Sequence, residues 1–219
     1  MNIAVLVSGG GTNLQAIIDQ IENQTLRGVT IVMIISSSHN AYAIERAKAH
    51  GIMSCVVSKK DFPDWNAYDE AMVQALSGQQ IELVVLAGFL SLLGPKVVRL
   101  FSNRIINIHP ALIPSFCGHG MYGIKPHEAA LARGVKVSGA TVHFVNDNYD
   151  EGPILLQKCI EVLDDDTPQS LQLRIMKECE QVILPAAIQL IADQKIYIED
   201  NRAYISRNCT EAEERDNHD

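Results

Sequence analysis

Short apolar runs alternate with amphipathic helical segments along the first half of the chain, and this alternation constrains the fold more than any other feature. The runs are rich in valine and isoleucine, as buried strands are, and helical segments separate them. The pattern predicts an α/β fold with a doubly wound, mainly parallel sheet and right-handed crossovers, Rossmann-like in its N-terminal half. The expected strands cover residues 3–7, 29–35, 53–57, 82–87 and 104–108.

The C-terminal half departs from this pattern. Residues 137–145 and 153–162 both have strand character, and only a short polar segment separates them. This spacing predicts a hairpin, which adds antiparallel strands to the sheet. Thr167 is a good N-cap and Pro168 suits the first helical position, so a helix is predicted to begin there. It should run towards Ile191, with Pro185 kinking or dividing it.

The composition is that of a soluble globular protein. Hydrophobic residues make up 47% of the 219 residues and charged residues 20%. No apolar run approaches the ~20 residues of a membrane helix, and the first residues lack the basic segment of a signal peptide, so we expect a cytoplasmic protein without a membrane partner. The formal net charge of −8 argues against a nucleic-acid partner. The five cysteines are scattered, so neither a disulfide framework nor a metal site is predicted.

Three glycines stand between the first expected strand and the first expected helix, in the segment SGGGTN of residues 8–13. Glycine lets the backbone approach a ligand closely, and the unpaired N–H groups of a helix N-terminus attract an anion. Leu14 stands where a dinucleotide fingerprint has its third glycine, and the second strand ends without a carboxylate for a ribose. The loop therefore predicts a site for a single phosphate group, with a flexible turn as the alternative.

Asn107 and His109 lie two residues apart in an isoleucine-rich run that ends at Pro110. Proline cannot donate to a sheet ladder, so the strand should end there, and alternate strand residues point to the same side. Ligands of open α/β sheets bind at the carboxyl ends of the strands. The pair could polarise a carbonyl group and transfer a proton. The alternative is a capping asparagine beside a half-buried histidine.

Two further loops are candidates for the site. Residues 88–94 follow a strand that is apolar throughout and form an apolar loop, which suits either a flat aromatic ligand or packing on the core. Residues 146–152 join the hairpin strands and hold three carboxylates, among them Asp147. Acidic turns are usually only solvated, so this loop gains meaning only beside the other features.

Together these features resemble the phosphoribosylglycinamide formyltransferases, folate-dependent enzymes of purine synthesis. The resemblance runs from Met1 to about Ile205. It implies transfer of the formyl group of the co-substrate 10-formyltetrahydrofolate to the amine of N1-(5-phospho-D-ribosyl)glycinamide, without a metal, in IMP biosynthesis. It rests on the segments SGGGTNLQ (8–15), VVLAGF (84–89), NIHP (107–110), SGATVHFVND (138–147) and GPILLQ (152–157).

The resemblance also implies roles for individual residues. The catalytic residues would be His109, Asn107 and Asp147. The ribonucleotide would contact Gly11, Thr12 and Asn13 through its phosphate, and also Lys177 and Glu180. The folate would contact Asn107, Leu90, Ser91, Leu92 and Leu93.

The chain departs from the family pattern at the folate site. Many members have an arginine near the position of Trp65 and another where Ser91 stands; Lys60 is the candidate to replace them. We expect one formyltransferase domain over residues 1–207, with a phosphate-binding half (1–100) and a catalytic and folate half (101–207). The last residues, 208–219, have no apolar face and are predicted to be disordered. A monomer or a homodimer is expected.

Three other interpretations stay open. Methionyl-tRNA formyltransferases share the Asn-x-His-Pro core but usually have a further tRNA-binding domain and lack this glycine loop. Formyltetrahydrofolate hydrolases usually have an additional N-terminal regulatory domain. A non-catalytic nucleotide-binding module would use the glycine loop but would leave Asn107, His109 and Asp147 unexplained.

Overall fold

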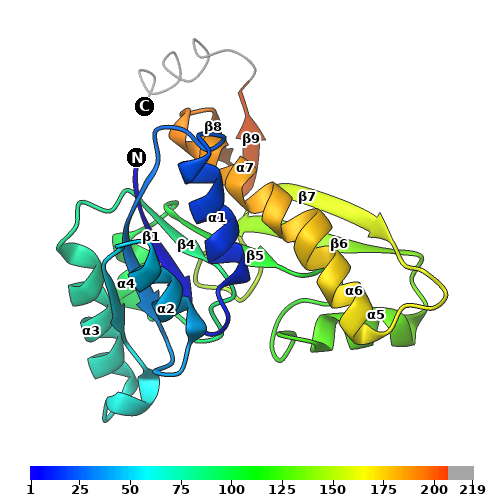
Figure 1. Cartoon of the computed structure of the whole chain (residues 1–219), viewed down its shortest axis with the longest axis horizontal. Coiled ribbons are helices and arrows are strands. Elements are labelled where there is room, and N and C mark those ends of the chain that lie inside the picture. Colours follow the sequence, from blue (N-terminus) through cyan, green and yellow to red (C-terminus); the bar gives the residue numbers. More distant parts are fainter. Residues whose placement is uncertain (207–219) are drawn as a thin grey trace.

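The computed structural model describes residues 1–206, and its centre is a seven-stranded sheet in the order β3-β2-β1-β4-β5-β6-β7 (Figure 1). The first five strands pair in parallel, whereas β6 pairs antiparallel with β5 and with β7. The predicted fold class is confirmed. The strands are β1 (Asn2–Val7), β2 (Thr30–Ser36), β3 (Ser54–Val56), β4 (Leu83–Leu86), β5 (Ile105–His109), β6 (Val137–Phe144) and β7 (Ile154–Glu161), and β8 (Ile196–Glu199) and β9 (Arg202–Ile205) form a separate antiparallel pair.

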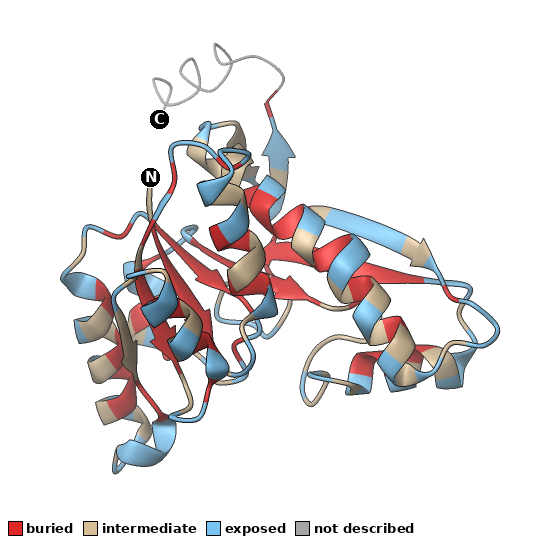
Figure 2. Cartoon of the chain, in the orientation of Figure 1, coloured by how far each residue is buried: buried red, intermediate tan, exposed pale blue. Residues whose placement is uncertain are grey.

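Helices cover both faces of the sheet. They are α1 (Thr12–Glu22), α2 (Tyr42–Ala49), α3 (Trp65–Ser77), α4 (Pro95–Leu100), α5 (Lys125–Arg133), α6 (Pro168–Ile175) and α7 (Gln181–Ala192), with a short 3₁₀ turn at Lys59–Asp61. Successive residues of a strand point to opposite faces. In β1, Ile3 and Val5 therefore pack in the core with α1 and α7, while Ala4 and Leu6 pack with α3 and α4. Figure 2 shows the resulting buried strands between partly exposed helices.

The C-terminal helical segment is continuous but irregular. Thr167 and Ser170 form a capping box at the start of α6, which confirms the predicted helix start. A π-helical turn, Met176–Glu180, separates α6 from α7 and lies before Pro185, which is inside α7. The predicted division is therefore present, but one turn upstream of the proline. A π turn widens the helix and re-aims its side chains, often at functional sites.

β5 ends at His109, and Pro110 follows, as predicted. β5 lies between the parallel part of the sheet and the antiparallel hairpin, so a loop from each of these two parts can reach its carboxyl end. Among the helices that the structure describes, none is long and apolar enough to cross a membrane. The predicted disordered tail lies outside the described residues.

Asp69 joins α3 to α4 inside the protein. Its side chain is 1% exposed and accepts hydrogen bonds from the backbone N–H groups of Lys96 (2.9 Å) and Val97 (3.3 Å). A Cβ atom at Gly94 would overlap the Asp69 carboxylate, so glycine is required there. Asp69 thus caps α4 from a neighbouring helix and fixes the end of the 88–94 loop.

Replacing Asp69 with alanine should lower the free energy of unfolding by about 2–4 kcal/mol, because two buried N–H groups would lose their acceptor. Asp69→Asn keeps an acceptor oxygen and should cost less. The matched control is Asp64→Ala, which removes the exposed N-cap of α3 and should cost about 1 kcal/mol. Urea unfolding measures all three, and equal losses for Asp69→Ala and Asp64→Ala would contradict the capping role.

Candidate active site

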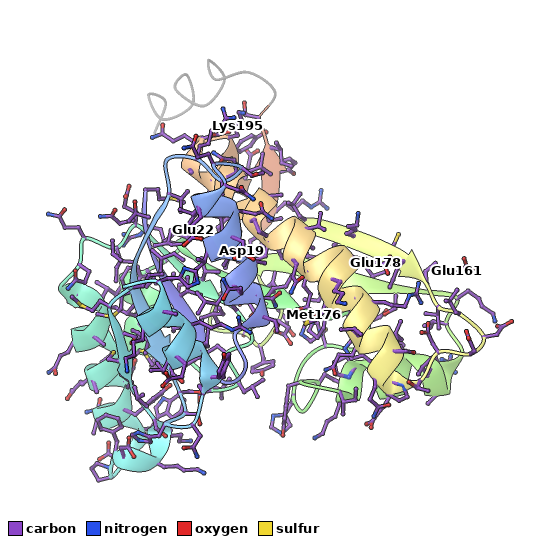
Figure 3. The ribbon with its side chains drawn as sticks, in the orientation of Figure 1. Asp19, Glu22, Glu161, Met176, Glu178 and Lys195 are labelled. Atoms are coloured by element: carbon purple, nitrogen blue, oxygen red, sulfur yellow. The ribbon has the colours of Figure 1, made fainter. Side chains whose placement is uncertain are left out.

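Two cavities meet at the carboxyl end of β5. The larger, of about 500 Å³, lies between the glycine loop and the C-terminal helical segment; the smaller, of about 280 Å³, lies beside the 88–94 loop. Figure 3 shows Met176 and Glu178 on that helical segment, which passes beside α1 with its labelled Asp19 and Glu22. The residues that line both cavities are Phe89, Asn107, Tyr149 and Asp150.

Asn107 and His109 both line the larger cavity, as expected from their positions in β5. The Asn107 amide nitrogen lies 3.1 Å from Nε2 of His143, on the adjacent strand β6. Nδ1 of His143 lies 2.8 Å from the carbonyl oxygen of Phe144, to which it can donate. In that tautomer Nε2 of His143 accepts from Asn107, and the Asn107 carboxamide is held in one orientation.

His109 is buried, with one ring nitrogen in a hydrogen bond and the other facing a carboxylate. Nε2 lies 2.9 Å from the carbonyl oxygen of Phe116, and Nδ1 lies 3.8 Å from a carboxylate oxygen of Asp150. The same carboxylate accepts from the N–H group of Gly118 at 2.9 Å and lies 3.6 Å from Nε2 of His143. Asp150 therefore links β5 and β6 to the 115–124 segment.

The carboxylate beside His109 belongs to Asp150 and not to Asp147, which corrects the geometry expected from the sequence. Because β6 runs antiparallel to β5, the chain leaves β6 beside Ile105, where Val145 donates to its carbonyl oxygen. It must turn back before a carboxylate can reach His109. Asp147 is exposed and borders the smaller cavity instead.

Burial and neighbouring charges shift the pKa values of His109 and Asp150 in a way that suits proton transfer. Burial lowers the pKa of His109, with a further contribution from His143, although the Phe116 carbonyl and the Asp150 charge oppose it. Burial alone would raise the pKa of Asp150, but His143, the Gly118 N–H group and His109 outweigh it and hold that pKa below its usual range. At neutral pH the pair is thus an ionised carboxylate beside a mainly uncharged imidazole.

The glycine loop forms one wall of the larger cavity, through residues 9–13. Gly11 has a left-handed backbone (φ 68°) and begins α1, which has no side-chain cap and no acidic residue in its first turn. A Cβ atom at Gly11 would lie 2.8 Å from that of Ala43, so glycine is needed for packing there, whereas Gly10 faces open space. The free N–H groups of the first turn make this wall suited to an anion.

The other predicted ribonucleotide contacts are partly brought together. Glu180, in the π turn, lines the larger cavity and accepts a 2.6 Å hydrogen bond from the Asn13 amide. Burial raises the pKa of Glu180, and the Asn13 hydrogen bond offsets part of this effect. Lys177, in contrast, is exposed and lines neither cavity.

The predicted folate contacts divide between the cavities. Ser91, Leu92 and Leu93 line the smaller cavity, together with other apolar side chains, whereas Leu90 lines the larger one. The N–H group of Leu90 donates to the hydroxyl oxygen of Ser8 (2.7 Å), which ties this loop to the glycine loop. Lys60 is exposed and borders neither cavity.

Sequence reasoning missed three site residues: Asp150, His143 and His127. Asp150 and His143 stand in the predicted hairpin, but nothing in their spacing separates them from other polar residues there. His127 is fully buried at the start of α5 and lines the larger cavity, and its ring nitrogens have no hydrogen-bond partner. Burial, aided by the nearby His109, lowers its pKa to about 4, so it is uncharged at neutral pH. Among the described residues there is no cluster of three metal-ligating side chains.

Known proteins with this architecture are also similar to this chain in sequence. A family model described as Formyl transferase matches residues 1–188. The phosphoribosylglycinamide formyltransferase of Escherichia coli (strain K12) is 35% identical over 205 residues, 94% of this chain and 93% of that protein. The chloroplastic phosphoribosylglycinamide formyltransferase of Arabidopsis thaliana is 37% identical over 195 residues, 89% of this chain and 66% of that protein. The chain spans only 14% of the trifunctional purine biosynthetic protein adenosine-3 of Drosophila melanogaster, which is 37% identical.

Solved structures agree. The glycinamide ribonucleotide transformylase 1 of Symbiobacterium toebii superposes with a TM-score of 0.88 at 40% identity, covering 94% of each chain. A formyltetrahydrofolate deformylase of Pseudomonas syringae pv. tomato has a TM-score of 0.84 at 24% identity, which supports the fold alone. The resemblance predicted from the sequence is confirmed. The glycine loop, the Asn-x-His-Pro strand end and this seven-stranded sheet identify the chain as a member of the formyl transferase family.

Proposed function

We propose that the protein is a phosphoribosylglycinamide formyltransferase, which transfers the formyl group of 10-formyltetrahydrofolate to the amine of N1-(5-phospho-D-ribosyl)glycinamide. The observation that carries this proposal is the junction of two cavities at Asn107 and Asp150. The larger has a phosphate-binding wall and suits the ribonucleotide. The smaller has an apolar side, which suits the pterin ring; its apolar side chains are Leu86, Phe89, Leu92, Leu93, Pro95, Val98 and Val145. The relatives with these names support the same assignment.

The reaction needs donors that are in place before charge develops. The substrate amine attacks the formyl carbon, and the formyl oxygen takes up the electron pair of the broken π bond. Asn107 lines both cavities, and its carboxamide is oriented by His143, so it can donate to this oxyanion. When the tetrahedral intermediate collapses, the carbon–nitrogen bond to the folate breaks.

His109, assisted by Asp150, transfers the proton from the attacking amine to the leaving folate nitrogen. The attacking amine must lose a proton and the leaving folate nitrogen must gain one. An imidazole that is mainly uncharged at neutral pH can accept the proton, and the Asp150 carboxylate, 3.8 Å away, stabilises the imidazolium that forms. The imidazolium can then return the proton to the leaving nitrogen. No nucleophilic residue of the protein and no metal is required.

Two wider inferences follow the same assignment. We propose that residues 1–207 act as one unit, since a single sheet joins both halves. We also propose a cytoplasmic location, which the free cysteines support: Cys55, Cys117, Cys159 and Cys179 form no disulfide in the described chain.

The direct assay mixes the protein with both substrates and follows the folate absorbance. Tetrahydrofolate should form only when the ribonucleotide is present, with one formylated ribonucleotide for each folate produced. Release of formate without the ribonucleotide would indicate a hydrolase and overturn the proposal. Formylation of methionyl-tRNA in its place would indicate the other relative with the Asn-x-His-Pro core.

Asp150→Asn should lower kcat by about 10²-fold or more, because a positioned acid–base group typically contributes 10²–10⁴ in rate. Removing the negative charge should also lower the pKa of His109 further, so the acid limb of the pH–rate profile should move to lower pH. A second change, His109→Asn, should add little to the loss in kcat, since losses within one unit do not sum. NMR titration of His109 and a double-mutant cycle on kcat provide these readings.

Asp147→Asn is the matched control, since it removes the same charge from the same loop but from an exposed position. It should leave the His109 pKa and kcat nearly unchanged and affect at most the KM for folate. A larger effect on the His109 pKa from Asp147→Asn than from Asp150→Asn would show that the pair has been assigned to the wrong carboxylate.

Gly10→Leu tests the two-cavity assignment. A Cβ atom at Gly10 would face open space, so the protein should still fold with a leucine there. The leucine side chain would, however, take up the space beside the glycine loop where the phosphate is proposed to bind. The KM for the ribonucleotide should rise about tenfold or more with folate affinity unchanged. Isothermal titration with each ligand separates the effects; loss of folate affinity alone would reverse the assignment. Gly11 is unsuitable for this test, because a side chain there would strain its backbone and collide with Ala43.

A further inference from the structure

The proposed phosphate in the larger cavity carries a negative charge that a cationic side chain would stabilise further. None of the described residues that line it is lysine or arginine, while Asp150 and Glu180 add acidic groups to the wall. Lys177, which the resemblance suggests as a ribonucleotide contact, is exposed and outside the lining. Helix N-terminal N–H groups carry only partial charge. A positive charge close behind the wall would therefore stabilise the bound phosphate further.

Arg46, on α2, lies directly behind the glycine loop. Its Nε donates to the carbonyl oxygen of Gly10 at 2.8 Å, and its Nη1 donates to Oε1 of Gln15 at 2.8 Å. Its Cδ atom would be 3.4 Å from a Cβ atom at Gly11, so the side chain also packs along the loop. The guanidinium is thus held by two hydrogen bonds and lies over the Tyr42 ring, with Cζ 5.1 Å from the ring centroid. Arg46 does not line the larger cavity.

Arg46 also fixes the direction of a peptide group. In a planar trans peptide the carbonyl and the following N–H point in opposite directions. Since the Gly10 carbonyl is turned towards Arg46, the N–H of Gly11 is turned away from it. The Gly9 carbonyl is held in the same way by the N–H of Ala43, at 3.2 Å, so the N–H of Gly10 is also turned away from α2.

We propose that Arg46 is a positioning and specificity residue for the phosphate group of the ribonucleotide, acting through the glycine loop without touching the substrate. It orients the N–H of Gly11 and supplies the positive charge that the cavity wall lacks. The inference rests on the proposed function, since that function gives the cavity its phosphorylated occupant. Its effect should depend on the phosphate and leave the transfer chemistry at Asn107 unchanged.

The test compares two substrates in the same variant: the ribonucleotide and the corresponding ribosylglycinamide without phosphate. Arg46→Gln should raise the KM for the ribonucleotide about tenfold or more, with kcat unchanged, and leave kcat/KM for the phosphate-free substrate within about twofold. Arg46→Lys keeps the charge and should recover part of the loss. Lys48→Gln removes an exposed charge from the same helix and should have no effect on either substrate.

Binding of inorganic phosphate gives an independent reading that does not need formyl transfer. Titration calorimetry should show phosphate binding to the wild-type protein weakened about tenfold or more in Arg46→Gln and unchanged in Lys48→Gln. Equal losses on both substrates, or unchanged phosphate binding in Arg46→Gln, would reduce Arg46 to a structural role and overturn the inference. Failure of the wild-type protein to transfer formyl groups, with phosphate binding still dependent on Arg46, would overturn only the proposed function.

Discussion

The site depends on the way β5 ends. Pro110 cannot continue the sheet ladder, so the strand ends there. Asn107 and His109 therefore stand at the carboxyl end of β5, where the larger cavity begins. β4 pairs with β5 in parallel and β6 pairs antiparallel, so β5 is where strand direction changes. This reversal brings His143 opposite Asn107 and lets the 145–153 loop fold back to His109. A regular parallel neighbour would place neither group there.

The electrostatic character of the site differs between the His109–Asp150 pair and the glycine-loop wall. Asp150, in the wall that both cavities share, lies beside His109 of the larger cavity; burial favours the neutral imidazole of His109 and the carboxylate favours the charged one. In the proposed function, that opposition lets the His109 imidazole accept and return a proton. In the proposed function, the glycine-loop wall attracts the phosphate through its backbone N–H groups and through Arg46 behind them. In the proposed function, separate cavities that share Asn107 and Asp150 bring an amine and a formyl group together without either ligand occupying the place of the other.

Much of this fold could be predicted from the sequence because the residues that begin and end individual helices and strands agree with the alternating apolar pattern of the whole chain. Pro110 ended a strand, Thr167 and Pro168 began a helix, and alternating apolar runs gave the parallel sheet. The site was less predictable. Asp147 and Asp150 stand in one loop, and choosing between them requires knowing where an antiparallel strand releases the chain. Lys177 stands at a family position and Lys60 was the candidate to replace the missing arginines, but both lie outside both cavities. No sequence pattern marks the hydrogen bond from Arg46 to the Gly10 carbonyl oxygen.

The central claim is that the two cavities hold the two substrates and meet at the reacting atoms. A crystal structure with the ribonucleotide and a folate analogue that cannot transfer its group measures this directly. The phosphate should lie against Gly10 and Gly11, the pterin beside Leu92, and the substrate amine next to the transferable carbon between Asn107 and Asp150. A phosphate bound elsewhere, or a folate occupying the larger cavity, would contradict the account.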